Sequence, residues 1–218
     1  MKSDTNILAL DTAFGEISAC IHTAEGSFLS AAATEHGKTR STSIVPMLNG
    51  LLNRAGITWN QLDLMALGAG PGSFTGLRIA AATLAGINSG MKLPILHLSS
   101  LAITARQADI TDPLWVLEDA RAGEAFVGLY HAGLAKGEDR CLRWDEVTVE
   151  LESGAFVCHN EPPVALDGWQ RLPLTIPRSK ALLAEALAEM DRVEESQLLH
   201  YPEPVYLQRS QAEKNIYG

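Results

Sequence analysis

The chain has 218 residues, of which 46% are apolar and 20% charged, as in soluble globular proteins of one large or two small domains. The net charge of −9 argues against broad nucleic-acid binding by the chain alone, which normally needs a basic surface. No apolar run approaches the ~20 residues of a membrane span, and the polar N-terminus lacks a signal-peptide pattern. We therefore expect a cytoplasmic protein that does not bind membranes.

Apolar runs and turn residues predict that the chain opens with an antiparallel meander and continues as alternating helices and strands. The strands expected in this half are Ile7–Thr12, Ile17–Thr23, Phe28–Thr34, Leu62–Ala69 and Pro94–Leu98. A first helix is expected from Thr42 or Ser43 to Arg54, because Pro46 fits only in a first turn. The other expected helices are Leu77–Asn88 and one that is capped by Ser99 or Ser100 and ends near Ala108.

Thr111-Asp112-Pro113 marks a boundary, after which the strand pattern restarts. The strands expected beyond it are Leu114–Leu117, Ala125–Tyr130, Val147–Val149, Ala155–Cys158 and Val164–Leu166. The Ala- and Leu-rich run Ser179–Met190 predicts a helix, and the residues from Tyr201 onward are expected to be extended. This order of elements predicts an α/β fold with a mixed sheet.

Three glycines lie in the segment Gly70–Gly76, between a predicted buried strand and a predicted helix, and argue against regular structure there. Such a loop leaves backbone N–H groups free at a helix N-terminus, which suits a phosphate. The segment lacks the lysine of a Walker A motif and does not match the dinucleotide fingerprint. A tight strand-to-helix turn packed on a neighbour is the alternative, and both interpretations stay open.

Asp11 and Thr12 follow the first predicted strand, where a carboxylate and a hydroxyl suit either magnesium or phosphate binding or the capping of a turn. The helix after the glycine loop is rich in small residues, which favours close packing on the protein's own sheet or across an interface. The three cysteines and six histidines show no disulfide or metal-ligand spacing, and no nucleophile elbow occurs. We therefore expect free thiols and no metal site.

Three segments together resemble one family, TsaB (also called YeaZ). They are Ile7–Ala13, Gly70–Ile79, and Asp119–Arg121 with Gly123-Glu124. The segment Pro204–Leu207 also resembles the family's C-terminal Pro-x-Tyr-Leu. The order and spacing agree over nearly the whole chain, and the string from Gly70 to Ile79 is the most diagnostic part.

The resemblance implies an actin-like (ASKHA, ribonuclease H-like) α/β fold with two lobes of mixed sheets and flanking helices, over residues 1–110 and 111–218. It implies a non-catalytic subunit that binds TsaD, its paralogue in the complex that transfers a threonylcarbamoyl group to adenosine 37 of tRNAs reading codons that begin with A. TsaE is the further expected partner, the isolated chain is expected to form a homodimer, and tRNA contact is expected only through the complex. The subunit itself is expected to need no cofactor, with ATP or ADP placed at the partner interface.

The resemblance also places the partner surface on the first two helices. The candidate interface residues are Pro71, Gly72, Ser73, Phe74, Thr75, Gly76, Arg78, Ala81 and Ala82. Relatives often carry His-Ser-Glu where this chain has Arg40-Ser41-Thr42, so this end of the first helix is expected to meet its partner differently. We expect Ala81→Arg or Ala82→Arg to leave a folded monomer that cannot bind TsaD.

An active ATPase or small-molecule kinase of the actin-like superfamily is the alternative function. It would use Asp11, Thr12 and the glycine loop, and it predicts that the isolated protein turns over ATP.

Overall fold

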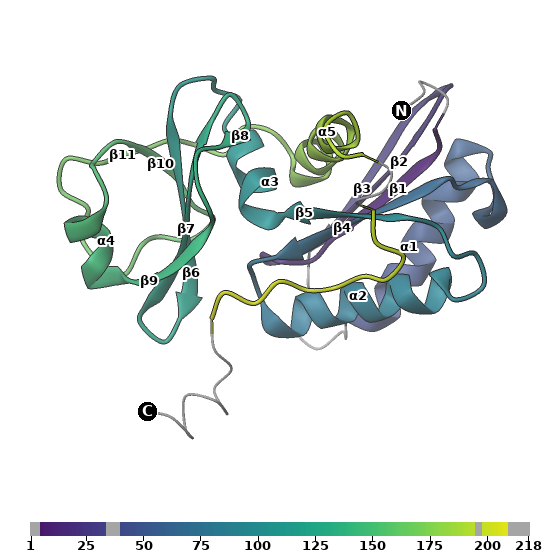
Figure 1. The fold of residues 1–218 in the computed structure, drawn as a ribbon, viewed down its shortest axis with the longest axis horizontal. Coiled ribbons are helices and arrows are strands. Elements are labelled where there is room, and N and C mark those ends of the chain that lie inside the picture. The colour runs from purple at the N-terminus through teal and green to yellow at the C-terminus, as the bar shows by residue number, and fades with distance from the viewer. Residues whose placement is uncertain (1–4, 34–39, 195–197, 209–218) are drawn as a thin grey trace.

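The computed structural model describes residues 5–33, 40–194 and 198–208. Two mixed β-sheets lie side by side, and most of the helices cover the first of them (Figure 1). The five-stranded first sheet has the order β3-β2-β1-β4-β5. Its strands are β1 (Ile7–Asp11), β2 (Glu16–Thr23), β3 (Gly26–Ala33), β4 (Leu64–Gly70) and β5 (Ile95–Ser99). The first three strands pair antiparallel, whereas β1, β4 and β5 run parallel.

The six-stranded second sheet has the order β11-β10-β6-β7-β8, with β9 also paired to β7. Its strands are β6 (Leu114–Arg121), β7 (Glu124–His131), β8 (Leu134–Ala135), β9 (Arg140–Arg143), β10 (Ala155–Val157) and β11 (Gln170–Arg171). The helices are α1 (Arg40–Ala55), α2 (Phe74–Asn88), α3 (Ser100–Arg106), α4 (Trp144–Glu150) and α5 (Arg178–Met190), with a 3-10 turn at Trp59–Gln61. No helix of the described ranges is long and apolar enough to cross a membrane.

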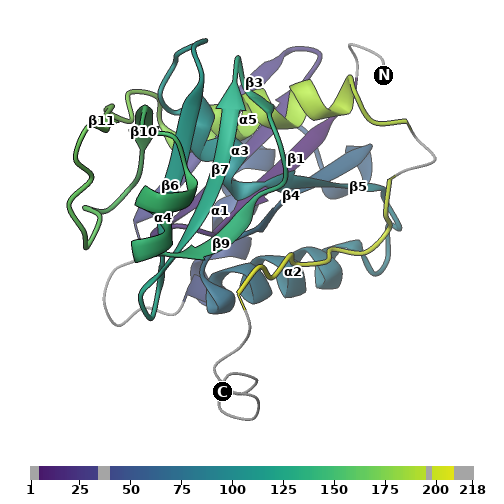
Figure 2. The same ribbon diagram turned by 60° about the vertical axis from the view of Figure 1, so that its left-hand side comes forward.

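Strand β1 is buried on both faces because helices cover both sides of the first sheet. Leu8 and Leu10 point to one side, where they pack with α1 and α2. Ile7 and Ala9 point to the other side, where they pack with residues of α5. The alternation follows from the two-residue period of a strand, and the continuous apolar run is typical of a strand with two covered faces. Both views show α5 and α2 on opposite sides of this sheet (Figures 1 and 2).

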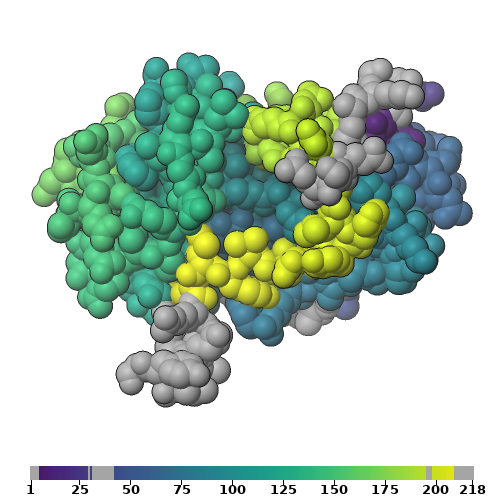
Figure 3. Space-filling model, in the orientation of Figure 1, coloured from purple at the N-terminus to yellow at the C-terminus, as the bar shows by residue number. Residues whose placement is uncertain are grey.

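The chain crosses between the sheets more than once. After the second sheet it returns through Leu172–Pro177 to α5, whose Ala181 and Leu182 lie in the core of the first sheet. Residues 198–208 then run back along α2 toward the second sheet, as the yellow segment of Figure 3 shows. The division of domains at residue 110 stays a prediction, although the second sheet does begin close to it, at Leu114.

Most predicted elements are confirmed, but several boundaries differ. Helix α2 begins at Phe74 rather than Leu77, because Ser73 caps it by accepting a hydrogen bond from the Gly76 N–H at 3.3 Å. The glycine segment therefore includes the end of β4 and the first turn of α2, so the expectation of no regular structure was wrong. Helix α1 begins at Arg40, which puts Pro46 in its second turn rather than its first.

The elements predicted beyond Pro113 differ more from the structure than those before it. The strand expected at Val147–Val149 is part of helix α4, whose start is stabilised by the Glu146 carboxylate accepting from the Arg143 N–H at 2.8 Å. Residues 164–166 form no strand. The short strands β8, β9 and β11 were missed, whereas the hairpin of β6 and β7 is longer than predicted and turns at Ala122-Gly123. The expected extended conformation from Tyr201 onward is confirmed as far as the described residues go.

Candidate functional site

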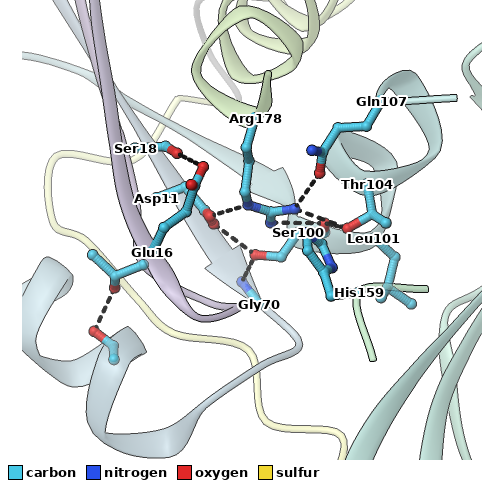
Figure 4. Close-up of polar contacts among 12 residues, drawn as sticks. Asp11, Glu16, Ser18, Gly70, Ser100, Leu101, Thr104, Gln107, His159 and Arg178 are labelled. Carbon is cyan, nitrogen blue, oxygen red and sulfur yellow. Dashed lines mark hydrogen bonds and ion pairs between the residues drawn. The ribbon is translucent and has the colours of Figure 1, made fainter. Parts of the chain in front are cut away.

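Asp11 stands at the end of β1, where a metal or phosphate site was one of the two expectations. Its side chain is fully buried, and its Oδ2 accepts a hydrogen bond from Arg178 Nε at 2.7 Å (Figure 4). Its Oδ1 accepts from the Ser100 hydroxyl at 3.1 Å. A Cβ at Gly68 would lie 2.0 Å from Oδ1, so the carboxyl group occupies space that only a glycine leaves free. Asp11 is thus the acceptor of an internal ion pair.

Arg178 comes from the first turn of α5, yet it is among the most deeply buried side chains of the protein. Its Nη1 donates to Thr104 Oγ1 at 2.9 Å and to Gln107 Oε1 at 3.1 Å. Its Nη2 donates to the Ser100 carbonyl at 3.2 Å. Four donor–acceptor pairs therefore hold the guanidinium between β1 and α3, which is the condition under which a buried ion pair is tolerated.

Thr12 is also buried, and its hydroxyl donates to the Gly76 carbonyl at 2.7 Å. Gly72 approaches Ala13 so closely that a Cβ on Gly72 would lie 2.6 Å from the Ala13 Cβ. The Ser73 N–H donates to the Ala13 carbonyl at 2.9 Å. These contacts fix the loop against β1, so the close-packed turn is the interpretation that the geometry favours.

Gly72→Ala is expected to lower the free energy of unfolding by about 1–3 kcal/mol, because the added methyl group overlaps Ala13. Gly86→Ala is the matched control, since a Cβ at Gly86 meets nothing. Within a helix that change should raise stability by about 0.5–1 kcal/mol. Urea unfolding of both variants checks the pair, and equal stabilities would contradict the packing argument.

A large cleft of about 1740 Å³ lies between the two sheets. Phe14, Arg78, Arg121 and Arg178 are among the residues that line it. On its floor, His159 Nδ1 lies 2.5 Å from Glu118 Oε1, and the His159 ring stacks on Phe14 with 5.6 Å between centroids. Glu118 also lines the cleft but is almost fully buried, and its carboxylate contacts both the ring and the backbone N–H of His159.

A second polar cluster joins the first sheet to the second. The Ser99 hydroxyl donates to Asp139 Oδ2 at 2.6 Å, and the Tyr130 hydroxyl donates to Asp139 Oδ1 at 2.7 Å. Burial raises the pKa of both Asp139 and Tyr130. Ser99 also caps α3 through the Leu101 and Ala102 N–H groups, which confirms it as the cap.

The candidate interface residues fall into an exposed and a buried set. Phe74, Thr75, Arg78 and Ala82 are exposed, whereas Pro71, Gly76 and Ala81 are buried, and Gly72 and Ser73 lie between. Ala81 packs in the core between α2 and the first sheet with 7% of its surface exposed. In contrast to the expectation from the sequence, Ala81→Arg is therefore predicted to destabilise the fold, because the long charged side chain would have to enter this core.

Three side chains form a contiguous group at the start of α2, which we call the aromatic ledge. The Arg78 guanidinium lies 3.7 Å from the Phe74 ring centroid and donates from Nε to the Tyr206 hydroxyl at 3.2 Å. The Phe74 and Tyr206 rings lie 5.1 Å apart. Phe74 and Tyr206 remain 42% and 44% exposed.

The sequence did not indicate Arg178, Ser100, Glu118 or Tyr206 as site residues. Arg178 follows a proline at a helix start, and an arginine in that place is normally solvent-exposed. Glu118 comes within the expected hairpin next to Asp119, but only its burial distinguishes it. Within the described residues, no group of three or more His, Cys, Asp or Glu side chains is placed to hold a metal ion.

All three cysteines are free, as expected. Burial raises the pKa of the Cys20 thiol to about 12 and that of the Cys158 thiol to about 11. These thiols are therefore poor nucleophiles near neutral pH, because the reactive form is the thiolate.

Residues 30–140 match the model of the protein family described as TsaD, tRNA N6-adenosine threonylcarbamoyltransferase. The chain is 28% identical over 200 residues to the tRNA threonylcarbamoyladenosine biosynthesis protein TsaB of Escherichia coli, with 80% of this chain and 83% of that protein covered. It is 36% identical over 103 residues to the TsaB of Haemophilus influenzae, a match that covers 47% of this chain and only 42% of that protein.

Among solved structures, the chain resembles YeaZ from Pseudomonas aeruginosa with a TM-score of 0.74 and 26% identity. The superposition covers 93% of this chain and all of the other. This likeness confirms the α/β fold with two mixed sheets that the resemblance implied. Together, the family match and the likeness in sequence and structure show that the chain belongs to the TsaB (YeaZ) family, within the wider family of TsaD.

Proposed function

We propose that this chain is a non-catalytic subunit of the complex that transfers a threonylcarbamoyl group to adenosine 37 of tRNAs reading codons that begin with A, and that it acts by binding TsaD. The observation that carries the non-catalytic role is the Asp11–Arg178 ion pair. The carboxylate that a nucleotide-hydrolysing relative would need at the end of β1 is here neutralised by a guanidinium of the same chain.

The position of the pair supports this role further. Arg178 lines the cleft, whereas Asp11 lies behind it, without exposed surface. A magnesium ion could reach Asp11 only if Arg178 left its pocket, which would break the four hydrogen bonds that hold its guanidinium. The alternative function as an ATPase or small-molecule kinase is therefore disfavoured. It predicts ATP turnover by the isolated chain that Asp11→Ala abolishes.

The exposed face of α2 supports partner binding. Between the aromatic ledge and the helix end, this face presents Ala82, Ala85 and Gly86, all small and exposed. Small side chains let a partner helix approach closely without losing side-chain entropy. We propose that TsaD binds to this face of α2 and that TsaE joins the complex. The isolated chain is proposed to form a homodimer, and tRNA is contacted only through the complex. We also propose that the protein is cytoplasmic, needs no cofactor itself, and that ATP or ADP binds at the partner interface.

The test is mass spectrometry of nucleosides from total tRNA, with this protein depleted and then restored. Threonylcarbamoyladenosine is expected to fall on depletion and to return with the wild-type chain. A restored copy with Asp11→Asn, once shown to be folded, is expected to support the modification, since Asp11 has no role in the chemistry. An unchanged level of the nucleoside after depletion would refute the proposal.

A further inference from the structure

Residues 198–208, which we call the C-terminal strap, have no helix or paired strand of their own but are tied down along their length. The Ile95 N–H donates to the Leu199 carbonyl at 2.6 Å, so the strap begins at the open edge of the first sheet. The Glu203 N–H donates to His97 Nε2 at 2.9 Å. The Val205 N–H then donates to the Ala69 carbonyl at 2.8 Å.

The end of the strap reaches both the proposed partner face and the second sheet. Tyr206 lies in the aromatic ledge with Phe74 and Arg78. Leu207 packs against the core of the second sheet, and the Gln208 amide donates to Glu124 of β7. Residues 205–208 of the strap therefore line the cleft, and the strap supplies one of the two rings of the ledge.

We propose that the C-terminal strap is a detachable, proton-sensitive element that completes the α2 partner surface when docked and withdraws Tyr206 from it when His97 is protonated. The proposal rests on the proposed function only for the identity of the partner. The docked state depends on an unprotonated Nε2, because that nitrogen accepts the hydrogen bond from the Glu203 N–H and cannot do so as N–H.

The surroundings of His97 set the direction of this switch. His97 lies in a recess of about 430 Å³, and the charged side chains that face the recess within the described residues are Glu203 from the strap and Glu189 from α5. Glu189 is paired with Arg192 at 3.2 Å. Burial lowers the pKa of His97 below its usual 6.5, and this outweighs Glu203 and the Tyr201 carbonyl, which both raise it.

Because the pKa of His97 is lower in the docked state than in the released state, His97 binds a proton more tightly when the strap is released. The strap is therefore fully docked above pH 6.5 and is weakened as the pH falls below that value. One unit below the pKa of the released state, the docking equilibrium shifts by at most about tenfold.

Amide hydrogen exchange of the full chain tests the switch without any partner. The amides of Glu203 and Val205 are expected to lose protection between pH 7.5 and 5.5, by up to about tenfold after correction for the intrinsic exchange rate. His97→Gln should keep its protection at both pH values, because the amide oxygen can accept the same bond but takes up no proton. Equal protection of the wild type at both pH values would overturn the switch.

His200→Gln is the matched control on the same strap. His200 Nδ1 lies 3.2 Å from the Lys92 carbonyl, and a protonated ring keeps that donor. The pH-dependent loss of protection should persist in His200→Gln, and its disappearance there would assign the switch to the wrong histidine.

TsaD affinity, measured by titration calorimetry, tests whether the docked strap completes the partner surface. Tyr206→Ala at pH 7.5 should bind about tenfold more weakly than wild type, and Val149→Ala, whose side chain is 84% exposed on α4 outside the proposed partner face, should bind equally well. Affinity should fall at pH 5.5 more in wild type than in His97→Gln. If TsaD binds but Tyr206→Ala has no effect, the strap does not complete the surface. If TsaD binds no variant at any pH, the proposed function fails, and the exchange data alone decide whether the strap switches.

Discussion

Arg178→Met is expected to lower the free energy of unfolding by about 3–5 kcal/mol, one of the largest effects of any single substitution in this protein. Methionine fills much of the same volume but leaves the buried Asp11 carboxylate without its cation. Thr104 and Gln107 also lose a donor in the same substitution. Because small and medium-sized proteins are stable by only about 5–15 kcal/mol, this loss is a large share of the total. Urea unfolding followed by circular dichroism measures it.

The double variant Asp11→Ala/Arg178→Met separates the ion pair from general packing. Removing both charges should cost about 2–3 kcal/mol less than the sum of the two single variants, since neither charge is then left alone. Arg192→Met is the control, because its pair with Glu189 is partly exposed and should contribute less than about 0.5 kcal/mol. Additive single effects would show that Asp11 and Arg178 do not depend on one another.

Ala82→Arg is expected to weaken TsaD binding more than about 100-fold, or roughly 2.7 kcal/mol, while the fold keeps its stability. Ala82 is exposed on α2, so the new side chain extends into solvent in the free protein. In a close-packed interface the same side chain would separate the two surfaces or bury a charge without a partner. Surface plasmon resonance with TsaD and a thermal melt of the free chain measure the two quantities.

Val149→Arg is the matched control for this variant. Val149 is 84% exposed on α4, which belongs to the second sheet and not to the proposed partner face. Its replacement should leave TsaD affinity unchanged. Wild-type affinity in Ala82→Arg would move the partner surface away from α2, and equal losses in both variants would indicate a non-specific effect of charge.

The first half of the fold was predictable because its signals are local. The apolar run at β1 indicates its burial directly, and Leu77, Ala81 and Leu84 recur at the helical period on the buried face of α2. The Gly70–Gly76 segment was recognised as a connection, but its alternatives could be separated only by the distance from Gly72 to Ala13. Short strands such as β8 and β11 carry too few residues for any periodicity.

The ion pair at the candidate site could not have been predicted, because it joins residues 167 positions apart. Until the cation beside it is known, the sequence is equally consistent with Asp11 as a turn cap, as a magnesium or phosphate ligand, or as an ion-pair partner. The α4 error has a different cause. Val147–Val149 are β-branched, but the acidic first turn at Asp145 and Glu146 stabilises a helix start and overrides that preference.

The return of α5 to the first sheet constrains how the chain can fold during its synthesis. When residues 1–110 have left the ribosome, the face of the sheet that carries Ile7, Ala9 and Leu64 still lacks its cover. That cover arrives with Ala181 and Leu182, after the whole second sheet has been made. The nascent N-terminal half thus presents an apolar surface of the kind that chaperones bind, and it should aggregate when expressed alone. The first sheet can therefore complete its core only after α5 has been synthesised, so the two halves of the chain depend on each other for folding.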